Sequence, residues 1–217
     1  MNTSHSDYSF DLGTHCPAFV ITNDEAAAWF ATGLSWLYGF NHEEAIGCFR
    51  NAARADDEFA LAWWGIALSS GPFMNKPWEW LTMPEKEQAL AACHGAISEA
   101  MARAATAPPE ARALIEALAV RYPQTAVPGD DVLASWERAY ADAMVPVYEA
   151  FGDDPDIAAL YIDSQIMLTP WQIYDVDKRA PNPEAREREI QTALRRSLAG
   201  TGADHIGVLH FDIHVQE

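Results

Sequence analysis

The chain has 217 residues, and its 32 acidic and 14 basic side chains give a formal net charge of −18 at pH 7. Hydrophobic residues make up 49% of it, which is enough for a sizeable core and argues against a disordered acidic tail. Only three lysines occur, which argues against a nucleic-acid partner. The sequence has no secretory signal and no charge-free run of 18 apolar residues, so we expect a cytoplasmic protein without a membrane partner.

Good helix formers dominate the sequence, and no alternating strand pattern stands out. Glycine and proline gather between the segments with helical periodicity rather than inside them. The pattern predicts helices over 24–38, 42–55, 58–70, 84–105, 109–121, 130–151, 155–168, 183–199 and from 203 to the end. The predicted fold class is therefore all-α.

An internal period of 34 residues relates the first helices. Trp29 and Trp63 are 34 residues apart, and so are Gly33 and Ala67. This period is typical of the tetratricopeptide repeat (TPR), a pair of antiparallel helices in which small residues allow close approach and aromatic residues fill the space between repeats. We predict a TPR-like α-solenoid, a single helical repeat domain over 1–217, with repeats near 24–57, 58–105, 130–168 and 183–217.

Two aromatic-rich segments, 71–83 and 169–182, interrupt this pattern. Long loops with large aromatic side chains are uncommon unless they fold over something. They would either cap the core or line a pocket in the concave face of the solenoid. The candidate pocket-lining residues are Asn41, His42, Trp64, Asn75, Trp78, Trp171 and Tyr174.

Three of the seven histidines lie within the last thirteen residues. On a helix, His210, His214 and Glu217 share one face, because residues three and four apart are neighbours. His205 precedes them and joins the candidate ligand set. A His-x-x-x-His pair with a carboxylate suits a divalent transition metal such as Zn, Cu or Fe. The competing interpretation is a polar seam in which these histidines hydrogen-bond neighbouring helices.

Several strings occur in a characteristic order, among them Tyr38-Gly-Phe-Asn-His-Glu-Glu-Ala45, Trp64-Gly-Ile-Ala-Leu68 and His205-Ile-Gly-Val-Leu-His-Phe-Asp-Ile-His-Val-Gln-Glu217. Together they resemble a family of uncharacterised bacterial TPR proteins whose members are usually more than twice this long. In that family a second histidine-rich stretch follows the segment that matches 205–217. The resemblance implies that this chain is the N-terminal part of a longer array. It implies little about activity.

Two functions are compatible with these features. The first is a helical scaffold that binds a protein, a peptide or a small molecule in its groove and carries a metal site near its C-terminal end. The alternative is a metal-dependent oxidase or hydrolase with a pocket inside the solenoid, for which His15 and His42 are additional candidate ligands. Apolar surface exposed near residue 217 would also favour a homo-oligomer.

Overall fold

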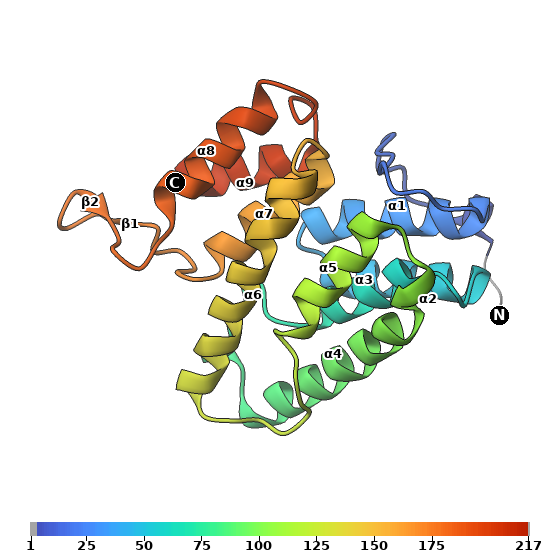
Figure 1. Ribbon diagram of the computed structural model, residues 1–217, viewed down its shortest axis with the longest axis horizontal. Helices are drawn as coiled ribbons and strands as arrows, with labels where there is room; N and C mark the ends of the chain where they lie inside the picture. The colour runs from blue at the N-terminus through green and yellow to red at the C-terminus, as the bar shows by residue number, and fades with distance from the viewer. Residues whose placement is uncertain (1–3, 217) are drawn as a thin grey trace.

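The computed structural model describes residues 4–216, most of which are helical (Figure 1). The α-helices in this part are α1 (Asp24–Tyr38), α2 (His42–Ala55), α3 (Ala60–Ser70), α4 (Met83–Arg103), α5 (Pro109–Ala119), α6 (Asp130–Phe151), α7 (Pro155–Ile166), α8 (Glu187–Leu198) and α9 (Ile206–Gln216). Between them lie the 3-10 helices η1 (His5–Asp7), η2 (Trp78–Trp80) and η3 (Ala104–Thr106), and the antiparallel strands β1 (Tyr174–Asp175) and β2 (Ala180–Pro181). The predicted all-α class is confirmed for the described residues.

Local signals set the starts of the helices that carry the site. Asn23 accepts a hydrogen bond from the amide of Ala26 before α1, and Asp154 accepts one from the amide of Asp156 before α7. Pro155 occupies the first position of α7, where the missing amide hydrogen costs nothing. These caps satisfy amides that a helix leaves unpaired at its start, and so fix where α1 and α7 begin.

One phenylalanine joins the first three helices. The buried ring of Phe49 on α2 lies between Gly33 of α1 and Gly65 of α3. A β-carbon on Gly33 would approach the ring to 2.6 Å, and one on Gly65 to 2.7 Å. Glycine is therefore needed at both positions for α1, α2 and α3 to pack this closely.

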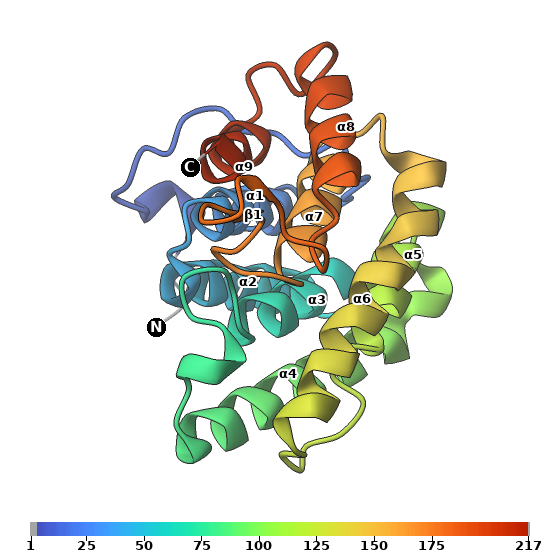
Figure 2. The ribbon, with the colours of Figure 1, turned by 90° about the vertical axis from the view of Figure 1, so that its left-hand side faces the viewer.

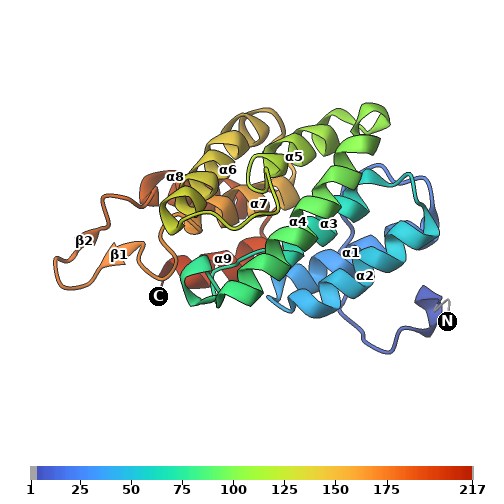
Figure 3. The same cartoon turned by 90° about the horizontal axis from the view of Figure 1, so that it is seen from below.

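Helix α9, near the C-terminal end of the sequence, packs against α1, the first α-helix. Each helix contacts the next one along the chain, and α9 also contacts α1 and α7. Figures 2 and 3 show α9 beside α1. Gly207 makes this approach close, because a β-carbon there would lie 2.7 Å from Tyr38. In a regular repeat array each repeat contacts only its neighbours. The contact of α9 with α1 departs from that pattern, and the TPR assignment stays a prediction.

The structure differs most from the predicted elements between residues 169 and 187. The helix expected over 183–199 begins at Glu187, because residues 182–185 form a turn in which the Asn182 side chain accepts the amide hydrogen of Glu184. The segment 169–182 contains the β1–β2 hairpin, whose two-residue strands are too short to leave an alternating pattern.

The buried apolar side chains form one cluster that runs from Phe19 to Phe211. Buried residues of all the long helices contribute to it, so the described chain has a continuous core. Among the described residues, no helix combines the length and the apolar character needed to cross a membrane.

Candidate metal centre

The structure separates the histidines that the sequence places together. His210 and His214 lie on α9, and their Nε2 atoms are 3.0 Å apart. His205 lies just before α9 and instead contacts α7 and the N-terminal segment. Glu217, the carboxylate expected beside the α9 pair, lies outside the described residues. The single four-residue ligand set expected from sequence is thus divided between two places.

Three segments far apart in the sequence bring two imidazoles and a carboxylate together. His15 belongs to the extended segment before α1, Asp156 to the first turn of α7, and His205 directly precedes α9. The Nε2 atoms of His15 and His205 each lie 3.1 Å from Asp156 Oδ1. One ligand atom from each side chain lies within 4.8 Å of the other two. We call these three residues the triad.

The triad is buried and carries a negative charge on Asp156. The Asp156 side chain is 2% exposed, and its Oδ1 also accepts a hydrogen bond from the Tyr38 hydroxyl at 2.7 Å. Burial raises the pKa of Asp156, but the contacts with His15 and His205 outweigh it and hold that pKa well below its usual value. Burial, followed by the nearby carboxylate, raises the pKa of Tyr38 well above its usual value, so the phenol remains a donor.

The two imidazoles of the triad differ in their hydrogen bonding. His205 Nδ1 accepts the amide hydrogen of Val208 at 3.3 Å, so in the metal-free protein the ring proton is on Nε2 and is donated to Asp156. His15 Nε2 is buried, and its 3.1 Å contact with Asp156 does not have the geometry of a hydrogen bond. The triad therefore contains a buried ring nitrogen without a hydrogen-bond partner.

This donor set could hold a metal ion. Two imidazole nitrogens and one carboxylate oxygen are typical ligands of zinc and of other divalent transition metals. Asp156 is not among the ligands that the sequence predicts, because nothing in Asp154-Pro155-Asp156 indicates a metal site. No local spacing relates positions 15, 156 and 205, so their proximity follows from the closure of α9 onto α1 and α7.

The α9 pair has its own surroundings. His210 Nδ1 donates to the backbone carbonyl of Tyr38. Phe40 packs against both rings, with centroid distances of 4.5 Å to His210 and 5.4 Å to His214. The indole of Trp171 meets His214 edge-on at 5.4 Å. Tyr38 thus contacts both clusters, through its hydroxyl at the triad and through its carbonyl at the pair.

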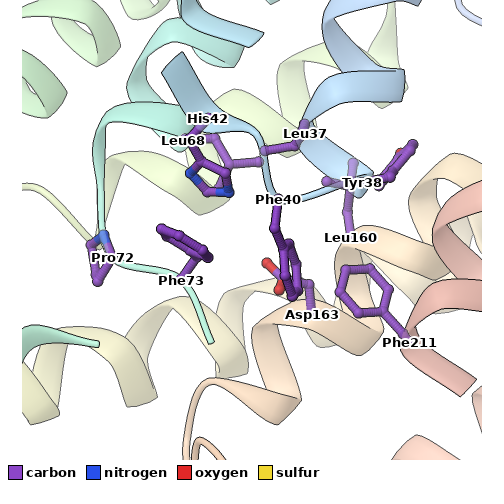
Figure 4. A pocket seen from close by; sticks show the side chains of 10 residues that line it. All are labelled: Leu37, Tyr38, Phe40, His42, Leu68, Pro72, Phe73, Leu160, Asp163 and Phe211. Atoms are coloured by element: carbon purple, nitrogen blue, oxygen red, sulfur yellow. The ribbon is translucent and has the colours of Figure 1, made fainter. Parts of the chain in front are cut away.

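A small cavity next to Phe40 and Phe211 is also lined by His42 and Asp163 (Figure 4). His42 donates its Nδ1 hydrogen to the carbonyl of Ser69 at 3.0 Å, and burial lowers its pKa to about 4. Burial also raises the pKa of Asp163 to about 6, so this carboxyl takes up a proton just below neutral pH. The cavity has a volume of about 10 Å³, room for roughly one water molecule.

The candidate pocket residues do not gather in one pocket. Asn41 and His42 line a groove beside α2, and Trp171 lines another beside η2. The remaining ones lie elsewhere: Trp64 is fully buried in the core, Trp78 is buried and donates to Glu137 at 2.8 Å, Asn75 is exposed in the turn after Phe73, and Tyr174 is half-exposed on β1. The segment 71–83 therefore anchors to the core through Trp78, whereas Trp171 remains 49% exposed.

Comparisons of the chain with protein-family models, with curated proteins and with solved structures found no match.

Proposed function

We propose that this protein is a TPR-like helical scaffold that holds a divalent transition metal through the triad. The observation that carries the proposal is the buried Nε2 atom of His15, which lies 3.1 Å from Asp156 Oδ1 without forming a hydrogen bond. A buried polar atom without a hydrogen bond costs free energy, and a cation between the rings and the carboxylate would offset that cost.

The position of the triad favours a structural role for the metal. All three side chains are largely buried, and they come from the N-terminal segment, α7 and α9. A metal there would tie these segments together, and its binding free energy would add to the stability of the fold.

Metal binding at the triad has a local cost at His205. Coordination through Nε2 requires the ring proton to move to Nδ1, which now accepts the amide hydrogen of Val208. The buried Val208 amide and the Nδ1 hydrogen would face each other as two donors without an acceptor, at a cost of about 1–3 kcal/mol that the metal would have to offset. The Val208 amide would then exchange its hydrogen faster in the metal-bound protein.

The scaffold part of the proposal rests on a groove beside α2, α3 and α4. It has a volume of about 580 Å³, and Asn41, Arg50, Lys76 and Glu85 are among the side chains that line it. Such a groove suits a peptide, a segment of a partner protein or a small molecule. The net charge of −18 favours neutral or basic partners.

The geometry supports the alternative, a metal-dependent oxidase or hydrolase, less well. Catalysis needs an open metal position with a substrate pocket beside it. The small cavity at His42 and Asp163 has other lining residues than the triad and holds about one water molecule. We therefore favour the scaffold.

Metal content measured by mass spectrometry tests this function. The full chain is stripped with a chelator, incubated with Zn²⁺ and freed of excess metal. We expect the wild type to retain one more zinc equivalent than His15→Ala or Asp156→Asn. The control is His5→Ala, which removes an imidazole of the N-terminal segment that hydrogen-bonds Thr32 of α1. Equal zinc retention in the wild type and Asp156→Asn would contradict the proposal.

A further inference from the structure

The imidazole pair on α9 has the geometry of a second ligand cluster. His210 Nδ1 carries a hydrogen, because it donates to the carbonyl oxygen of Tyr38. In the neutral ring this leaves a lone pair on Nε2, the atom that faces Nε2 of His214 at 3.0 Å. A backbone carbonyl that accepts from the far ring nitrogen is also the arrangement that orients metal-bound histidines in proteins.

The ligand type indicates the class of metal. The 3.0 Å between the two Nε2 atoms is the length of the hydrogen bond that they form without metal, whereas two nitrogen ligands in a tetrahedral site with bonds of about 2.0–2.1 Å lie about 3.3 Å apart. A small shift of one ring would therefore admit a metal ion between them. Imidazole suits Cu(II), which nitrogen sites bind most tightly among the divalent first-row metals.

The surroundings of the pair hold the rings and leave them accessible. His214 stacks on Phe40 with an angle of 16° between the ring planes, and the indole of Trp171 packs edge-on against the same imidazole. Both imidazoles are partly exposed, in contrast to the buried Asp156 and His205 of the triad. A metal at the pair would therefore exchange with solvent, and water could complete its coordination.

We propose that His210 and His214 bind a Cu(II) ion through their Nε2 atoms, at a site independent of the triad. The proposal does not rest on metal binding by the triad, because the two clusters have different ligands and different accessibility. Without metal, the same two nitrogens form an N–H···N hydrogen bond.

Titration of the chelator-stripped full chain with Cu(II), followed by electron paramagnetic resonance, tests this site. We expect His214→Ala to bind one tight copper equivalent fewer than the wild type, and to lose the nitrogen hyperfine signal of that ion. His94→Ala, which removes a partly buried histidine of α4, is the matched control and should bind as the wild type does. His214 is the better choice for substitution, because His210 also connects α9 to Tyr38.

The triad variant Asp156→Asn separates this proposal from the proposed function. The α9 site predicts that Asp156→Asn keeps the copper equivalent that His214→Ala loses. The proposal is overturned if His214→Ala, folded by circular dichroism, binds as many copper equivalents as the wild type. It is also overturned if Asp156→Asn, rather than His214→Ala, loses the nitrogen signal.

Discussion

Asp156 is the residue on which the buried polar contacts converge. Its Oδ1 receives the Tyr38 hydroxyl at 2.7 Å and lies 3.1 Å from a ring nitrogen of each triad histidine. A carboxylate with this many polar contacts remains ionised in spite of its burial, which suits it to a cation. Residue type alone makes the histidines candidate ligands, but nothing local distinguishes Asp156 from the many other acidic residues of the chain.

Asp163 shows the opposite behaviour, and its titration gives a prediction. Its pKa is raised from 3.8 to about 6 by burial. Between these values the folded state holds a proton that the unfolded state has lost, so stability falls as the pH rises. We expect Asp163→Asn, which does not titrate, to gain stability relative to the wild type by up to about 3 kcal/mol between pH 4 and pH 7.

Urea denaturation at several pH values measures this difference. The exposed Asp177, replaced by Asn, provides the control and should follow the wild type across the range. A constant difference between Asp163→Asn and the wild type from pH 4 to pH 7 would show that the carboxyl titrates normally.

At the scale of elements, the sequence predicts where helices begin and end better than it predicts which helices contact each other. Caps and periodicity act within a few residues, and the predicted bounds of α1, α2 and α6 agree with the structure. The β1–β2 hairpin was not predicted, because two-residue strands carry no periodic signal. The position of His205 depends on where α9 docks, and that docking is set by distant residues.

The glycine positions against Phe49 give a prediction at this scale. Gly33→Ala would place a β-carbon 2.6 Å from the ring, so α1 or the ring must move. We expect a net loss of roughly 1–2 kcal/mol, because overpacking outweighs the better helix propensity of alanine. Gly47→Ala on the exposed face of α2 meets no atom within 4 Å and should instead stabilise the protein by up to about 1 kcal/mol. Thermal unfolding of the two variants compares them, and a destabilised Gly47→Ala would contradict this account.

At the scale of the whole molecule, the closure of α9 onto α1 and α7 creates the triad. Its three residues come from the N-terminal segment, the start of α7 and the residue before α9. An open array would keep these segments apart, since its repeats contact only their neighbours. The predicted solenoid therefore gives no reason to expect these three side chains to lie close together.

Gly207 tests the link between closure and the metal centre. A β-carbon at this position would lie 2.7 Å from Tyr38, so Gly207→Ala should move the start of α9 away from α1. We expect the affinity of the triad for zinc to fall by about tenfold or more, which is typical when a residue that positions a metal ligand is changed. Isothermal titration measures it, with Gly95→Ala, which meets no atom within 4 Å, as the control. An unchanged zinc affinity in Gly207→Ala would show that metal binding by the triad does not depend on the contact between α9 and α1.

The central claim is that a metal at the triad joins the two ends of the chain. Thermal unfolding with and without Zn²⁺ tests it most directly, in a His214→Ala background that removes the α9 pair. At a zinc concentration of about 100 times the dissociation constant, we expect stabilisation by about 2.7 kcal/mol, a rise of roughly 5–10 °C in the unfolding midpoint. Adding Asp156→Asn should abolish the rise. A rise of equal size in that variant, or none in the parent, would contradict the claim.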